Sequence, residues 1–187
     1  MPDRQIAASI LESCRQGDRD AFRALYEAYN DKVYSICLYF FHGDEAEAAD
    51  VTQEVFLKLF AGVAGFRGDA GFSTWLYRLV RNACLDESRR KAARARLSEP
   101  ERRATHERAL LDPVDAKAVQ RAVSALPPKF RLPILLRYFE EYSYEELSEA
   151  LNCSMGTVAS RINRGHKMLA NLLEPMRDRL VAGGHHV

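Results

Sequence analysis

The segment from Met155 to Leu173 gathers hydroxyl and cationic side chains on one predicted helix. It contains three basic residues and no acidic one. At 100° per residue, its apolar residues share one narrow stripe, formed by Met155, Val158, Ile162 and Leu169. Hydroxyl and basic side chains occupy much of the remaining arc: Thr157, Ser160, Arg161, Arg164 and Lys167. Because such groups donate hydrogen bonds to phosphates and base edges, the pattern favours a helix that enters the major groove of DNA.

A shorter predicted helix, Tyr144 to Leu151, precedes this segment and is joined to it by a tight turn. Asn152 tolerates the left-handed conformation at a helix end, and Ser154 has the side-chain oxygen needed to cap the next helix. The pair is typical of a helix-turn-helix. The alternative is a helical hairpin with a solvated basic face, which is the commoner structure. That alternative explains neither the cap and turn at this spacing nor the absence of acids, so we favour DNA recognition.

A glycine-rich loop and the helix after it form a second candidate nucleic-acid site. Residues 61–71 contain four glycines in eleven positions and therefore predict a loop. The next helix begins at Ser73 or Thr74, runs to Lys91 and carries Trp75 at the edge of a face formed by Arg78, Arg81 and Arg89. An aromatic ring beside cations suits unstacked bases, which need a flat partner and neutralised phosphates. A core tryptophan beside a solvated face is the alternative, and the residues alone leave the two evenly balanced.

The segment from Asp44 to Phe60 contains a candidate protein-docking face. Asp44 and Glu47 form an N-terminal capping signature for its helix. The side opposite its apolar residues presents Asp50, Gln53, Glu54 and Leu57. A large apolar residue among acids and amides is typical of a docking surface. A single exposed leucine is also ordinary, so the pattern favours docking without requiring it.

Charge and cysteine spacing exclude several classes of function. Residues 1–60 hold six basic and eleven acidic side chains, whereas residues 78–108 hold ten basic and five acidic ones. This difference suggests different partners for different segments. The cysteines are far apart, without histidine at ligand spacing: Cys14, Cys37, Cys84 and Cys153. With neither a phosphate cradle nor a nucleophile–base pair, we predict no enzyme activity, cofactor or metal. Reduced thiols and the lack of a long apolar run predict a cytoplasmic protein.

An all-α fold is predicted, because almost every segment has helical periodicity. Two small helical domains, residues 1–91 and 113–187, are joined by residues 92–112, which are charged, have little to bury and predict a flexible linker. In the first domain, the aromatic stripe that includes Tyr26 is interpreted as core. Further helices are expected over residues 6–14, 20–40, 115–126 and 130–139.

The helix expected over residues 130–139 carries two additional candidate residues and one constraint. Lys129 and Arg131 lie at its start, where they could contact phosphate. Pro133 is tolerable there only if it falls in the first turn of the helix, because proline removes a backbone donor.

Three stretches carry a specific resemblance to a known family. They are DVTQEVFLKLF (Asp50 to Phe60), FRGDAGFSTWLYRLVRNACLDESRR (Phe66 to Arg90) and LPPKFRLPILLRYFEEYSYEELSEALNCSMGTVASRINRGHKML (Leu126 to Leu169). In this order and spacing they resemble bacterial RNA polymerase sigma factors, specifically the extracytoplasmic-function group of the sigma-70 family. The resemblance covers nearly everything from Asp18 to Leu173. It departs from the family at Asn152, where glycine is frequent, and at Gly71 in the loop.

The resemblance implies a role for each candidate face. The first stretch would bind the clamp helices of the largest core polymerase subunit through Asp50, Gln53, Glu54 and Leu57. The second would melt the minus-10 promoter element and read it as single strand with Arg67, Asp69, Phe72, Trp75, Arg78, Asn82, Arg89 and Arg90. The third would read the minus-35 element as duplex with Lys129, Arg131, Thr157, Ser160, Arg161, Arg164 and Lys167. Family members are commonly held inactive by an anti-sigma factor, which is therefore an expected partner of an otherwise monomeric chain.

Two other classes of function remain alternatives. A stand-alone helix-turn-helix regulator would use residues 1–90 for dimerisation or sensing and bind palindromic duplex sites alone. The glycine-rich loop before Trp75 and the long linker argue against it. An adaptor that binds only proteins would leave the acid-free recognition helix unexplained.

Overall fold

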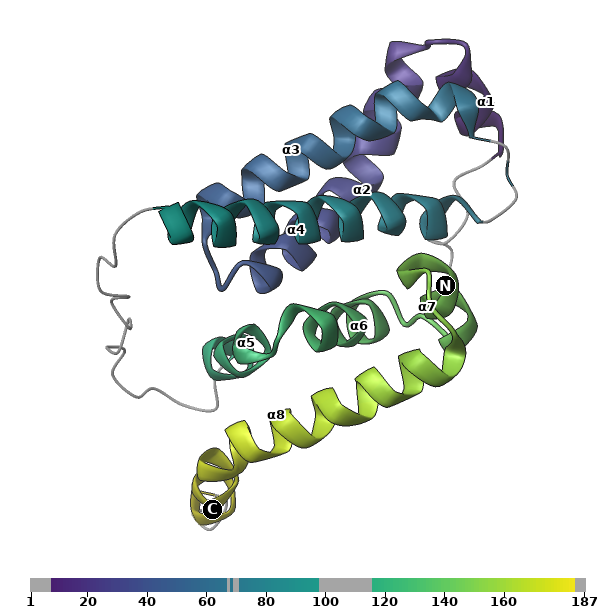
Figure 1. Ribbon diagram of the computed structural model, residues 1–187. Helices are drawn as coiled ribbons and strands as arrows, with labels where there is room; N and C mark the ends of the chain where they lie inside the picture. The colour runs from purple at the N-terminus through teal and green to yellow at the C-terminus, as the bar shows by residue number, and fades with distance from the viewer. Residues whose placement is uncertain (1–7, 67, 69–70, 98–115, 184–187) are drawn as a thin grey trace.

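The computed structural model describes residues 8–66, 68, 71–97 and 116–183, and all regular structure in these ranges is helical. An all-α fold is therefore confirmed for the described residues (Figure 1). The elements are α1 (Ala8–Arg15), α2 (Arg19–Phe40), α3 (Glu45–Gly62), the 3-10 helix η1 (Val63–Gly65), α4 (Phe72–Leu97), α5 (Ala116–Ala125), α6 (Pro128–Phe139), α7 (Tyr144–Leu151) and α8 (Met155–Gly183).

Side-chain caps explain where several helices begin. The Asp44 carboxylate accepts a hydrogen bond from the Glu47 N–H at 3.0 Å, as the capping signature predicts. For α2 the cap is Asp18, which accepts from the N–H groups of Asp20 and Ala21. Helix α4 continues through Leu97, so residues 92–97 are helical although the sequence pattern places them in the linker.

Helix α6 begins earlier than expected and carries a proline in its interior. Pro128 occupies the first helical position, where its fixed φ suits a helix start. Pro133 therefore lies beyond the first turn, and the expectation that it belongs to that turn is wrong. Its missing N–H removes one hydrogen bond of the helix. The burial of consecutive residues from Phe130 to Leu136 offsets this cost.

The turn between α7 and α8 has the predicted backbone. Asn152 adopts φ 49° and ψ 56°, the left-handed conformation that asparagine tolerates at a helix end. Ser154 then caps α8 by accepting from the Thr157 N–H at 3.2 Å. Gly165 lets α8 approach α6 closely, since a Cβ at this position would lie 3.1 Å from Ile134 Cγ1.

The helices form two packed groups that share one continuous core. Helices α1 to α4 make the first group and α5 to α8 the second, with α4 lying between the rest of its group and α7 (Figure 1). Aromatic rings of the two groups are in contact. The ring centroids of Tyr39 and Phe139 lie 5.0 Å apart, and those of Tyr77 and Tyr142 lie 5.5 Å apart. The sequence predicts the two helical groups, but it contains no local signal for this contact between them.

Arg131 is a buried contact between the two groups. Its guanidinium donates hydrogen bonds to the backbone carbonyls of Phe40 in α2, Ser124 in α5 and Leu126 after it. The residue is only 4% exposed, and burial lowers the pKa of its guanidinium to about 10. In this arrangement Arg131 faces carbonyls and not solvent, so the expectation that it contacts DNA phosphate does not hold here.

None of the helices in the described ranges combines the length and apolar composition that a membrane span needs.

Replacing Ser143 tests the cap at the start of α7. Its hydroxyl accepts from the Glu146 N–H at 3.2 Å, while the Glu146 carboxylate accepts from the Ser143 N–H at 2.7 Å. Ser143→Ala should lower the free energy of unfolding by about 1 kcal/mol, measured by urea denaturation with circular dichroism. Ser160→Ala, at an exposed position inside α8, should change it by less than about 0.5 kcal/mol. Equal effects of the two variants would contradict the capping assignment.

Replacing Arg131 tests the contact between the groups. Arg131→Met should lower the free energy of unfolding by about 3 kcal/mol, because buried carbonyls lose their donor. Lys129→Met is the matched control, since it removes an exposed cation from the same helix and should have little effect. Urea denaturation of both variants measures the difference. Wild-type stability of Arg131→Met would show that the guanidinium contributes no net stabilisation.

Candidate nucleic-acid interface

The apolar side of α8 packs against the core, so the polar side of the helix faces solvent. Val158 and Ile162 are buried, and Leu169 packs partly buried against the core, as the periodicity predicts. Met155 is 50% exposed, so its assignment to the buried stripe is wrong. It occupies the first helical position, where no neighbouring helix covers that side. The buried contacts of α8 thus begin one turn after its start.

The predicted recognition residues gather in one place. Ser160, Arg164 and Lys167 are exposed, whereas Thr157 and Arg161 are half-buried. All of these except Lys167 line a hollow of ≈ 470 Å³, together with Lys129 at the start of α6. The hollow is lined by Lys129, Phe130, Ser154, Gly156, Thr157, Ser160, Arg161 and Arg164, with no acidic side chain among them. Hydroxyl donors and cations on an open helix face are suited to contacts with phosphates and base edges.

The aromatic residues at the start of α4 form a cluster with the preceding loop. Trp75 is half-buried, with its ring centroid 5.1 Å from that of Phe66 and 5.8 Å from that of Phe72. The sequence left Trp75 between core and surface, and the structure places it at the boundary. Phe72 is only 8% exposed and also contacts Tyr29, so it is a core residue and not an open stacking partner. Arg67 and Asp69, also predicted to contact the minus-10 strand, lie outside the described residues.

Two α4 arginines bind the end of α7. Arg78 Nε donates to the Glu149 carbonyl at 2.9 Å, and Arg81 donates to the Ala150 carbonyl at 3.4 Å. The last carbonyls of a helix lack intrahelical partners and attract cations, which accounts for the pairing. Burial is the larger cause that lowers the pKa of Arg81, and the nearby Arg78 charge lowers it further. These side chains therefore face α7, not a nucleic-acid strand, in this arrangement.

The remaining predicted residues of α4 are open to solvent. Asn82 is exposed and accepts a hydrogen bond from Arg81 at 2.7 Å. Arg89 pairs with Asp86 at 3.2 Å, and Arg90 pairs with Glu54 and Glu87 at 3.3 and 3.2 Å. Exposed ion pairs contribute little to stability, so these cations can exchange carboxylates for phosphates at small cost.

A groove between α2 and α3 includes two residues of the predicted docking face, Gln53 and Leu57. Its volume is ≈ 540 Å³, and it is lined by Tyr26, Asn30, Tyr34, Ala49, Thr52, Gln53, Phe56, Leu57 and Phe60. Leu57 is 59% exposed and Tyr26 is 43% exposed. The interpretation of Tyr26 as core is wrong, because it lies at the rim of the groove. The apolar residues of α2 spread over more of its circumference than its neighbours cover. This excess of apolar residues is the sequence signal that could have indicated the groove.

The polar residues of the docking face lie in two environments. Asp50 and Gln53 are exposed, but Glu54 is turned towards α4. Its carboxylate accepts from Lys58 at 2.6 Å and from Arg90 at 3.3 Å. The Lys58 hydrogen bond is the main cause that holds the pKa of Glu54 below its ordinary value. Leu57 and Gln53 are therefore the centre of the accessible face, with Glu54 at its edge.

Comparison with known proteins places both helical groups in one family. Residues 25–94 match the family described as Sigma-70 region 2, and residues 116–169 match Sigma-70, region 4. The ECF RNA polymerase sigma factor SigW of Bacillus subtilis (strain 168) is 33% identical over 180 residues, covering 89% of this chain and 96% of that protein. The RNA polymerase sigma-H factor of Pseudomonas aeruginosa is 34% identical over 182 residues, covering 89% and 93%.

Two solved structures share the fold. One is the sigma factor RpoE in complex with the anti-sigma factor NepR from Bartonella quintana, with a TM-score of 0.68, 22% identity, and coverage of 82% of this chain and 96% of that chain. The other is CnrH in complex with the cytosolic domain of CnrY, with a TM-score of 0.68, 23% identity, and coverage of 92% and 97%. With both sigma-70 regions matched across the helices described above, the chain belongs to the extracytoplasmic-function sigma factors of the sigma-70 family.

Proposed function

We propose that this sigma factor binds core RNA polymerase and directs initiation by reading the minus-35 element as duplex and the minus-10 element as melted strand. The observation that carries the proposal is the open polar face of α8, in which an acid-free set of hydroxyls and cations surrounds a capped helix start. Family membership supplies the role of such a helix. The role needs no covalent chemistry.

Minus-35 recognition is assigned to the start of α8. The turn at Asn152 directs α8 away from α7, and the buried Val158 and Ile162 orient the opposite face outward. Ser160, Arg164 and Lys167 are then free to reach base edges and phosphates of a major groove. Lys129 lies beside them and would add a phosphate contact.

Minus-10 recognition is assigned to the exposed side of α4. The exposed part of the Trp75 ring would stack on an unpaired base, while Asn82, Arg89 and Arg90 would contact the strand. Capture of unstacked bases in this way would offset an unstacking cost of a few kcal/mol.

The two domains must separate before the minus-10 surface is complete. Arg78 and Arg81 are bound to the carbonyl end of α7, so they reach a DNA strand only after α7 has moved away from α4. Binding of core polymerase and promoter would supply the free energy for this opening, because both ligands favour the open form.

Core polymerase binding is assigned to the groove between α2 and α3. An exposed leucine beside aromatic side chains and the amide of Gln53 provides an apolar centre with a polar edge, which is the usual anatomy of a protein interface. The partner would be the clamp helices of the largest subunit. An anti-sigma factor is a second proposed partner, because RpoE, which shares this fold, is solved in complex with the anti-sigma factor NepR.

Run-off transcription with purified core polymerase on a genomic promoter library tests the whole proposal. Start sites that appear only when this protein is added would establish it, and their alignment would give both elements. Silent core enzyme together with tight binding to duplex DNA alone would instead favour a stand-alone regulator.

Removal of the α8 arginines should weaken promoter use selectively. Arg161→Ala and Arg164→Ala should each reduce run-off product about tenfold or more, since each loses a DNA contact worth about 1–3 kcal/mol. Co-elution with core polymerase should be unchanged. Arg19→Ala, which removes an exposed cation at the start of α2, serves as the charge-matched control. Loss of core binding in either α8 variant would remove these arginines from the DNA surface.

A charge introduced into the α2–α3 groove should abolish polymerase binding. Leu57→Asp places a carboxylate at the exposed apolar centre of the groove, where burial against a partner would require its desolvation. We expect no co-elution with core polymerase and an unchanged circular dichroism spectrum. Leu172→Asp makes the same substitution at another exposed leucine, in α8, and should co-elute normally. Wild-type co-elution of Leu57→Asp would refute the assignment.

A further inference from the structure

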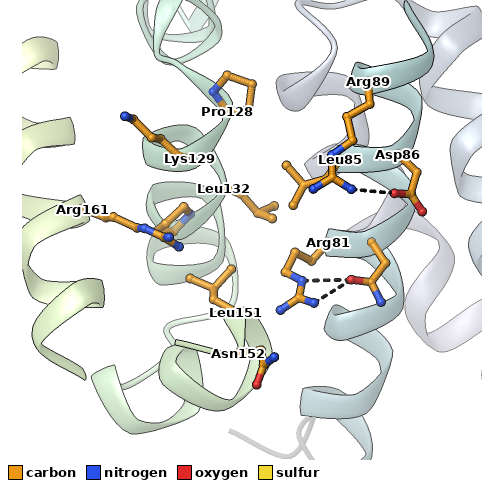
Figure 2. Close-up of a pocket in the computed structure, with 12 residues that line it drawn as sticks. Arg81, Leu85, Asp86, Arg89, Pro128, Lys129, Leu132, Leu151, Asn152 and Arg161 are labelled. Atoms are coloured by element: carbon orange, nitrogen blue, oxygen red, sulfur yellow. Dashed lines mark hydrogen bonds and ion pairs between the residues drawn. The ribbon is translucent and has the colours of Figure 1, made fainter. Parts of the chain in front are cut away.

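A cleft lies between the two domains, on the side of α4 that faces α6, α7 and α8. Its volume is ≈ 360 Å³, which is within the range of about 300–1,000 Å³ typical of small-molecule sites. The lining residues are Arg81, Asn82, Leu85, Asp86, Arg89, Pro128, Lys129, Leu132, Pro133, Leu151, Asn152 and Arg161. Figure 2 shows Arg81 and Arg89 on the α4 side, with Lys129 and Arg161 on the opposite side.

Four cations and one carboxylate line this cleft, so its charge is strongly positive. The carboxylate, Asp86, is already bonded to Arg89 at 3.2 Å. Within the described part of the chain, no ion pair is found for Lys129 or Arg161: Lys129 lies over the Phe130 ring at 4.9 Å, and Arg161 approaches Cys153 Sγ at 3.7 Å. Arg161 thus faces Arg81 and Arg89 across the cleft without equal negative charge, whereas the exposed Lys129 ammonium points away from α4 in Figure 2 and must turn to reach the cleft.

Mutual repulsion follows from this arrangement. Burial lowers the pKa of Arg81, and the positive charges of Arg78 and Arg161 lower it further, as expected for cations that line one cleft. Partial burial strengthens such interactions, because less water screens them. A bound anion would offset the repulsion and would be attracted from both sides.

The other lining residues restrict the kind of anion. Leu85, Leu132 and Leu151 add apolar side chains to the lining (Figure 2), and Asn82 and Asn152 add amide groups. Guanidinium groups bind phosphate oxygens with favourable paired geometry. A compact molecule with several phosphates and an apolar ring fits the volume, the positive charge and the apolar lining of the cleft.

We propose that this interdomain cleft binds a small anion with two or more phosphate groups, of the class of nucleoside polyphosphates. Because both domains contribute cations, the anion binds the closed arrangement and favours it over the open one. One consequence rests on the proposed function: the anion would compete with promoter DNA, since the same cations belong to the DNA surfaces. The binding site itself does not depend on that function.

Isothermal titration calorimetry of the full chain at low ionic strength, with EDTA and without DNA or polymerase, tests the site. The probes are inorganic tripolyphosphate and ATP. We expect saturable 1:1 binding and an increase in Kd of about tenfold for both Lys129→Ala and Arg89→Ala, which remove one exposed cation from each side. Arg19→Ala has the same change in net charge outside the cleft and should bind as the wild type does.

Three outcomes would overturn the proposal: no binding of either probe at millimolar concentration, an equal loss of affinity in Arg19→Ala, or a loss in only one of the two cleft variants. The last would place the anion on one domain alone. Tighter binding of ATP than of tripolyphosphate would assign the site to a nucleotide, and equal binding would assign it to the polyphosphate chain; both uphold the anion site. A negative run-off experiment leaves this measurement unaffected, so the two proposals fail separately.

Discussion

Burial of the Arg131 guanidinium is the constraint on which the arrangement of the two helical groups depends. Carbonyls from both domains surround it, and the Phe40 ring lies 5.3 Å from its guanidinium carbon. A buried cation is stabilised only while such acceptors remain in place. When the domains separate, water can replace the carbonyls, so the contact can open without leaving an unsatisfied charge. An arginine at this position therefore favours a reversible interface over a permanent one.

The second contact between the domains uses residues with a proposed role elsewhere. Arg78 and Arg81 occupy the carbonyl end of α7, which offers partial negative charge much as a phosphate does. The closed arrangement thus satisfies the same arginines that the proposed open form would offer to DNA. Exchange of one acceptor for another has a smaller net cost than exposure of an unpaired group. This exchange, together with the anionic site proposed beside it, would let a small difference in free energy determine which form is populated.

Local patterns in the sequence predicted much of the fold and part of the site. The Asp44 cap, the left-handed Asn152 and the Ser154 cap all depend on contacts within three or four residues, which a sequence displays directly. The buried Val158 and Ile162 follow from helical periodicity in the same way. The family followed from three motifs in a fixed order, and the matched regions confirm it.

Long-range packing decided the rest. Arg131 and Phe40 are 91 residues apart, and no local pattern indicates that a cation at the start of α6 binds a carbonyl of α2. Periodicity shows which side of a helix is apolar but not how much of it a neighbour covers, so Tyr26 and Met155 are exposed although both belong to apolar stripes. The sequence by itself determined that the described chain is helical, the caps at Asp44 and Ser154, and the family. Only the tertiary structure decided which cations face solvent, because burial depends on what the rest of the chain places against each side chain.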